Sequence, residues 1–84
     1  MEIAERVRQA VVDAFPGCDP RLEWDDGLQK VVGVVLWDDF EKLDHVTRQR
    51  KLWSVLKKAL GPNAQQVSLL LTYTPHEYET YLAA

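Results

Sequence analysis

Apolar positions follow two different spacings along the chain, and the spacing predicts which segments form helices and which form strands. Across residues 2–14 apolar side chains recur every three or four positions, which indicates an amphipathic helix. A second stripe of this kind covers residues 52–60, and Gly61-Pro62 follows it in the order expected at a helix end. The two stripes consist of Ile3, Val7, Ala10, Val11 and Ala14, and of Leu52, Val55, Leu56, Ala59 and Leu60.

Three segments have the composition of strands. RLEWD (21–25) alternates apolar and polar residues, as a half-buried strand does, and Asp26-Gly27 after it is a hairpin signal. Residues 30–37 are β-branched and almost wholly apolar, which predicts a central strand, where Gly33 indicates a bulge or a close approach by a helix. QVSLLLTYT (66–74) forms the third strand.

The chain ends in a predicted short helix over residues 75–82. Thr74 is the expected cap, Pro75 occupies the first helical position, and Glu77 completes a capping box. With a short helical link after Phe40 and Asp44 as the next cap, the element order becomes α-β-β-α-α-β-α. We therefore predict a single α+β domain over residues 1–84, with a three-stranded mixed sheet and helices on one side.

Charge is distributed unevenly along the 84 residues. Residues 1–44 carry eleven acids and five bases, whereas residues 45–76 carry five bases and no acid, and the net charge is −3. This pattern predicts a local basic patch on an otherwise acidic molecule. The single cysteine, Cys18, cannot form an internal disulfide, and no apolar run is long enough to span a bilayer, so we expect a cytoplasmic protein without membrane contact.

The candidate chemical groups do not form a catalytic pattern. The acid pairs Asp25-Asp26 and Asp38-Asp39 lack a nucleophile and base, and no glycine spacing matches a phosphate loop. Cys18, His45 and His76 do not share a short metal-ligand spacing. We expect these three to be an ordinary thiol and two surface or capping side chains, and we expect no enzymatic activity, cofactor or metal.

The basic residues of the long helix have two interpretations. Arg50, Lys51, Ser54, Lys57 and Lys58 share the face opposite the apolar stripe, which suits either a solvated helix back or a contact surface. Arg48 and Arg50 lie near the helix opening, where the macrodipole disfavours cations. We therefore expect them either to pair with an upstream acid or to bind an outside anion. Trp24 and Trp37 are predicted core residues, whereas Trp53 lies beside the apolar seam and is a candidate interface residue.

Several motifs in this order resemble the BolA family. F-E-x-x-x-x-V-x-R-x-R is met by Phe40, Glu41, Val46, Arg48 and Arg50, and KLWSVLKKALGP and SLLLTYTPHEY follow it. The resemblance implies a small non-enzymatic domain similar to type II KH domains. It also implies a link to monothiol glutaredoxins, iron–sulfur handling and transcriptional regulation under stress.

The chain departs from that family at informative positions. Gln49 stands where the family usually has a histidine, and Gln66 aligns with the histidine that ligates a shared [2Fe–2S] cluster. The loop DDGLQ (25–29) lacks the histidine or cysteine of the second ligand, and Lys42 and Leu43 replace a usual glycine and lysine. The resemblance therefore implies a member without its own cluster ligands, because glutamine does not supply an imidazole nitrogen to iron.

Two functions follow. In the first, the chain is an adaptor or regulator that docks a monothiol glutaredoxin-like protein through the helix 48–60, the last strand and the last helix. In the second, the basic helix 48–58 binds nucleic acid as a transcriptional regulator, although the chain has no GXXG clamp and is net negative. The predicted contact residues are Arg48, Arg50, Lys51, Trp53, Lys57 and Tyr73. The oligomeric state does not follow from the sequence.

Overall fold

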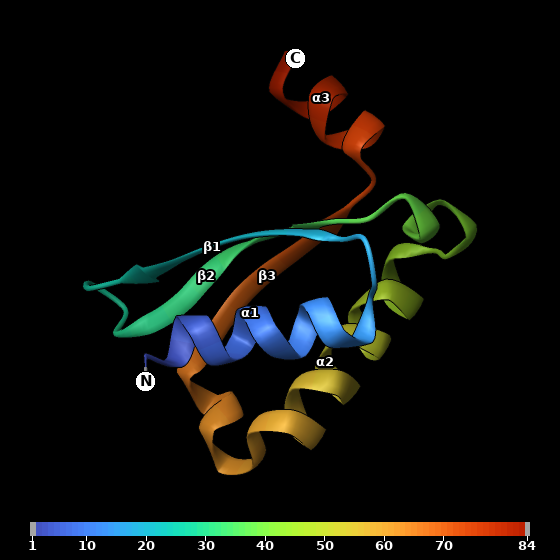
Figure 1. Ribbon diagram of the computed structural model, residues 1–84. Helices are drawn as coiled ribbons and strands as arrows, with labels where there is room; N and C mark the ends of the chain where they lie inside the picture. The colour runs from blue at the N-terminus through green and yellow to red at the C-terminus, as the bar shows by residue number, and fades with distance from the viewer. Residues whose placement is uncertain (1, 84) are drawn as a thin grey trace.

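A computed structural model describes residues 2–83 and has the α+β architecture expected from the sequence (Figure 1). The helices are α1 (Ile3–Ala14), α2 (His45–Leu60) and α3 (Pro75–Ala83), and the strands are β1 (Asp19–Asp25), β2 (Lys30–Leu36) and β3 (Val67–Tyr73). Two short 3₁₀ helices, η1 (Asp38–Lys42) and η2 (Gly61–Gln66), flank α2. The short helix expected after Phe40 is present as η1, but it begins earlier, at Asp38, and contains Phe40; α2 already begins at His45.

The sheet is mixed, with the order β1-β2-β3. β1 and β2 form an antiparallel hairpin, whereas β2 and β3 are parallel because α2 crosses between them. The prediction that residues 30–37 form the central strand is confirmed. β1 and β3 are the two edge strands.

α1 and α2 cover one face of the sheet (Figure 1). Their apolar stripes meet the inner side chains of the sheet and Phe40 of η1 in one core. Fully buried side chains in this core include Val7, Val11, Val35, Leu52 and Leu56. The expectation of helices on one side therefore holds for α1 and α2. α3 differs, because it lies beyond the opposite side of the sheet and buries no residue.

The predicted irregularity at Gly33 is confirmed as a bulge. The register between β2 and β3 shifts between Val31 and Gly33. A Cβ atom at Gly33 would lie 2.2 Å from the carbonyl oxygen of Arg21, so a strand approaches closely here and not the helix that the sequence analysis allowed for. The backbone φ of 153° also suits glycine.

The predicted helix caps are present. The Asp44 carboxylate accepts a hydrogen bond from Thr47 N at 2.7 Å, and Gly61 ends α2 with a φ of 57°. At α3, Glu77 N donates to Thr74 Oγ1 at 3.1 Å while Glu77 Oε1 accepts from Thr74 N at 2.9 Å. These reciprocal bonds are the capping box expected from the sequence.

One local prediction was wrong, and one turn differs in detail. The hairpin signalled by Asp26-Gly27 forms, with a four-residue loop over 26–29 in which the positive φ of 57° belongs to Gln29. Gln29 N donates to Asp25 O and closes this loop. Trp24 is 40% exposed and not a core residue, because it lies near the outer end of an edge strand. Trp37 is half-buried, packs against Phe15 and Phe40 and donates from Nε1 to Pro16 O.

Candidate functional site

Arg48 is a structural residue of the core. Its side chain is buried, with 3% of the residue exposed. Nε donates to the carbonyl oxygens of Phe40 and Leu43, both at 2.9 Å, and Nη1 donates to Thr72 O at 3.3 Å. The guanidinium also forms a two-pronged ion pair with Glu77. The prediction that Arg48 contacts a partner is therefore wrong, since its donors are used inside the chain.

The Arg48–Glu77 pair decides between the two explanations that the sequence left for Arg48. An internal ion pair forms, but its acid lies downstream in α3 and not upstream. The hydrogen bonds from Arg48, and then the bond from Thr74 N, lower the pKa of Glu77 to about 2. Glu77 is thus both the capping-box acid of α3 and the counter-ion of a buried arginine.

Gln49 covers the free edge of β3. Its Nε2 donates to Leu70 O at 2.8 Å and to Thr72 Oγ1 at 3.2 Å. Tyr73 O accepts from Trp37 N on the β2 side, so the carbonyls of Leu70 and Thr72 point to the free edge. Consecutive α2 side chains, Arg48 and Gln49, therefore occupy two carbonyls that an edge strand would otherwise leave open.

A shallow apolar hollow lies on the exposed flank of α2. We call it the α2 surface, and it is lined by His45, Val46, Gln49, Arg50 and Trp53. Val46 is 62% exposed and lies beside the half-buried Trp53 in this hollow. Gln49 Oε1 accepts from Trp53 Nε1 at 3.3 Å, so the indole is oriented by the same amide that holds the edge of β3.

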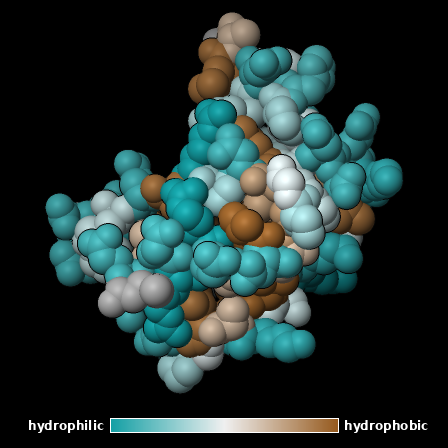
Figure 2. All heavy atoms as spheres, in the orientation of Figure 1, coloured by the Kyte–Doolittle hydropathy of each residue, from teal (hydrophilic) through white to brown (hydrophobic). Residues whose placement is uncertain are grey.

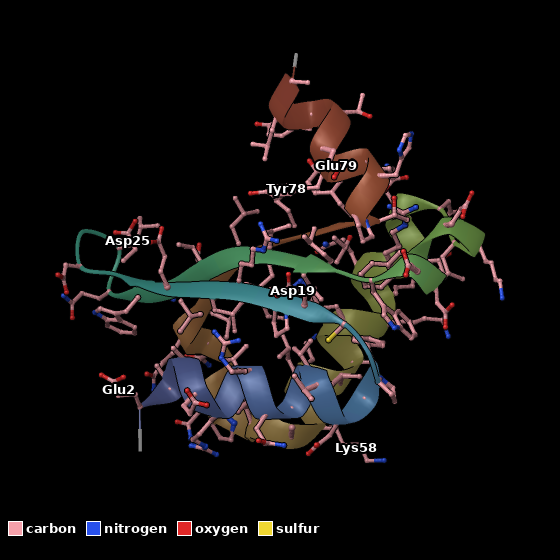
Figure 3. The ribbon with its side chains drawn as sticks, turned by 45° about the horizontal axis from the view of Figure 1, so that its top comes forward. Glu2, Asp19, Asp25, Lys58, Tyr78 and Glu79 are labelled. Carbon is pink, nitrogen blue, oxygen red and sulfur yellow. The ribbon has the colours of Figure 1, made fainter. Side chains whose placement is uncertain are left out.

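The structure brings together only some of the predicted contact residues. Arg50 and Trp53 share the α2 surface, and Arg50 also borders a second hollow with Lys51, Ala14 and Phe15. Lys57 is exposed in the last turn of α2 and lines neither hollow. The basic residues therefore continue along α2 from the apolar hollow toward its C-terminal end. Figure 3 shows Lys58 on the opposite side of the molecule from Glu79 of α3.

Tyr73 lies at the other end of this region. Its ring stacks on Tyr81 with centroids 5.9 Å apart and lies 6.1 Å from Tyr78. The His45 ring meets Tyr73 edge-on at 6.4 Å. His45 therefore connects the α2 surface with an aromatic cluster of Tyr73, Tyr78 and Tyr81 that belongs to β3 and α3.

Val46 and Gln49 were not predicted to form a surface, and His45 was expected to be a surface or capping side chain. Val46 and Trp53 are seven positions apart and Gln49 lies between them, so the three follow one helix face. This spacing was available in the sequence. It was overlooked because the stripe is narrow and runs beside the stronger core stripe of the same helix.

The positions that the family resemblance associates with a cluster lie at the opposite end of the sheet. Val31 pairs with Val67, which places Gln66 beside Lys30 at the end of the β1–β2 hairpin, and Lys30 Nζ donates to Gln65 O. Gln66 is exposed and its Nε2 meets Asn63 Oδ1 at 3.5 Å. Amides and an ammonium do not fit an iron–sulfur cluster, which takes thiolates and imidazoles.

Other metal-ligand types do not converge either. Within residues 2–83, no three side chains of His, Cys, Asp or Glu are grouped so that they could hold a metal ion. Cys18 lies between α1 and β1, where its Sγ donates to Val11 O at 3.8 Å. Burial, and then the nearby Asp19 charge, raise the pKa of the Cys18 thiol, which disfavours the thiolate that metals bind.

Among the helices of the described chain, none has the length and apolar character that a bilayer crossing requires.

Comparison with known proteins gives structural but not sequence-profile matches. No family model and no curated protein matches the chain. A BolA protein homologue from Coxiella burnetii is 28% identical, with a TM-score of 0.66 over 94% of this chain and 99% of that one. A Bol-like protein from Babesia bovis is 16% identical, with a TM-score of 0.65 over 98% and 95% of the two chains. The second likeness concerns the fold alone.

These findings agree with the motifs around α2 and α3. The mixed three-stranded sheet, the two helices on its inner face and the α3 helix define a small α+β domain with the BolA fold. The fold and the 28% identity to the Coxiella burnetii protein support a BolA-like protein.

Proposed function

We propose that this chain is a cytoplasmic, non-enzymatic adaptor or regulator that binds a monothiol glutaredoxin-like protein through the α2 surface without supplying cluster ligands. The observation that carries the proposal is the α2 surface itself. It exposes Val46 and part of Trp53 beside the cationic Arg50. An aromatic anchor with an apolar neighbour and an arginine is the combination found at the centres of protein interfaces.

The surrounding structure supports a rigid docking site. Arg48 ties the N-terminal half of α2 to η1, β3 and α3, and Gln49 ties the same turn to the edge of β3. Trp53 is held by Gln49 in turn. Binding to side chains that are already ordered costs less entropy than binding to mobile ones.

One observation favours nucleic acid as a second candidate. Arg50, Lys51, Lys57 and Lys58 are all exposed along α2, and together they form a cationic face. The burial of Arg48 removes one cation from that face, and the chain as a whole is negative. We therefore place protein docking first and use salt dependence to separate the two, because phosphate contacts weaken steeply with salt.

The experiment is an NMR titration of the labelled full chain with a monothiol glutaredoxin, apo and cluster-loaded, followed also by visible absorption. We expect shifts confined to residues 45–58 and 70–73, no absorption bands that depend on this chain, and a shallow salt dependence. Shifts centred on Gln66 and the 26–29 loop, with a new cluster spectrum, would contradict the proposal.

Matched variants sharpen the test. Val46→Glu places a charge in the α2 surface and should weaken binding at least tenfold, whereas Val12→Glu changes a valine on α1 that is 38% exposed and should leave binding unchanged. If the glutaredoxin causes no shifts, protein docking of this kind is wrong. A short duplex DNA titrated in parallel then tests the cationic face.

A further inference from the structure

α3 has few packing contacts within its own chain, chiefly those of Tyr78 and Tyr81 with Tyr73. It is nine residues long, and none of its residues is buried. A helix this short is unstable in water without tertiary contacts. Its first turn is held by the capping box and by Arg48, but its last turn exposes Tyr81 (61%) and Leu82 (63%). Figure 2 shows apolar side chains at the tip of this helix, standing clear of the body of the molecule.

The sheet face that α1 and α2 leave open is only partly covered, by α3. A hollow lies over this face beneath α3, and its floor includes Val32, Val34 and Leu71. Leu69, at the β3 side of the hollow, is 57% exposed, and Leu71 is 37% exposed. Tyr78 and Tyr81 of the same chain line one side, so the hollow is apolar but only partly filled.

Charge distinguishes the hollow from α3. Arg8 and Arg21 border the hollow, with Glu23 beside them. α3 contains two glutamates and no lysine or arginine. Glu77 is engaged by Arg48, whereas Glu79 is exposed and lies three positions before Leu82, on the same side of the helix. The helix is thus acidic where the rim of the hollow carries Arg8 and Arg21, and Arg21 has an exposed partner of its own in Asp19, at 3.1 Å.

We propose that two copies of this chain form a twofold-symmetric dimer in which α3 of each copy packs into the open sheet face of the other. Leu82 then covers Leu69 and Leu71 of the partner copy, and Glu79 approaches Arg21 of the partner copy. The same chain carries both the uncovered helix and the uncovered face. In the twofold arrangement each copy uses both surfaces at once, so the assembly closes after two subunits. The hollow beneath α3 shares no lining residue with the α2 surface, although His45 of the α2 surface meets Tyr73, which stacks on Tyr81.

The interface is small. Only a few apolar side chains per copy become buried, which is less than the roughly 800 Å² per partner of a standard interface. We therefore expect a dissociation constant between about 1 μM and about 1 mM. Association should be visible at the concentrations used for NMR and absent at those used for fluorescence.

Sedimentation velocity over a concentration series tests the dimer directly. The wild type should shift from monomer to dimer with rising concentration, and Leu82→Glu should remain monomeric. Val12→Glu and Val46→Glu, at exposed valines outside the interface, should dimerise like the wild type. A wild type that stays monomeric up to millimolar concentration overturns the proposal, as does a Leu82→Glu variant that still dimerises.

A charge exchange tests the proposed pairing between copies. Arg21→Glu and Glu79→Arg each place like charges together in a homodimer, so each variant alone should dimerise at least tenfold more weakly. A mixture of the two restores opposite charges at both contacts and should dimerise as the wild type does. Because both positions are exposed, neither change should unfold the chain. Failure of the mixture to associate would show that Arg21 and Glu79 do not meet.

The dimer and the proposed docking function can fail separately. Leu82→Glu should bind a glutaredoxin normally, and Val46→Glu should lose that binding while it still dimerises. A Leu82→Glu variant that also loses glutaredoxin binding would show that the partner, and not a second copy, occupies the α3 face.

Discussion

Arg48 of α2 and Glu77 of α3 form the two-pronged ion pair that joins the last helix to the body of the domain. Nη1 lies 2.7 Å from Oε1 and Nη2 lies 3.1 Å from Oε2. The Arg48 side chain is 4% exposed and that of Glu77 is 37% exposed. Because Arg48 also donates to carbonyls of η1 and β3, one side chain of α2 links η1, β3 and α3.

Removing Arg48 should therefore destabilise the whole domain. Arg48→Ala leaves the carbonyls of Phe40 and Leu43 without this donor and Glu77 without its counter-ion, and we expect a loss of about 3 kcal/mol. Arg50→Ala, at an exposed position on the same helix, should change stability by less than about 0.5 kcal/mol. Urea unfolding at neutral pH compares the two. Equal stabilities would mean that the buried arginine contributes nothing beyond its packing.

The lowered pKa of Glu77 predicts a stability loss in acid. The folded-state value is about 2 and the ordinary value is 4.5, so the charged form is favoured by folding. The contribution is fully present above pH 4.5 and is lost as the pH falls toward about 2. We expect it to amount to about 1–2 kcal/mol, because solvent screens a carboxylate that is partly exposed. Urea unfolding of wild type and Glu77→Gln across this range measures it. The two curves should converge in acid, and parallel curves would contradict the assignment.

The helices and strands could be predicted from the sequence more fully than the roles of the residues around α2. Both helix stripes, the central strand, the capping box and the bulge at Gly33 are local signals of spacing and residue type, and the structure confirms them. The role of Arg48 depends on Glu77, which lies 29 positions away, so no local pattern reveals the pair. The exposure of Trp24 likewise depends on which strand becomes an edge, and that is a property of the assembled sheet.

Gly33 is the position where a methyl group should be tolerated least. Its Cβ would lie 2.2 Å from Arg21 O and 2.9 Å from Leu22 Cα, both backbone atoms that move only with the strand. Gly33→Ala should therefore separate β1 from β2 and cost more than 3 kcal/mol, roughly the scale of severe backbone and packing defects. Gly61→Ala is the control, since its Cβ would meet nothing within 4 Å and only its backbone conformation, with φ 57° and ψ −131°, opposes it. That change should cost about 1–3 kcal/mol by thermal or urea unfolding. A Gly33→Ala protein as stable as the Gly61→Ala protein would contradict the close strand approach.

Replacing the amide nitrogen of Gln49 by a hydrogen-bond acceptor should destabilise the domain, because Gln49 Nε2 donates to Leu70 O. In Gln49→Glu a carboxylate oxygen replaces Nε2 and faces Leu70 O, so we expect a loss of about 1–3 kcal/mol at neutral pH. The carboxyl can donate only when protonated, so folding raises its pKa and the loss should shrink as the pH falls through that folded-state pKa. The measurement is the difference in unfolding free energy between variant and wild type at each pH, which removes the acid effect of Glu77. Gln66→Glu, at an exposed amide, should show no such pH dependence. A constant deficit at every pH would mean that Gln49 holds the edge of β3 by its shape and not by its donated hydrogen bond.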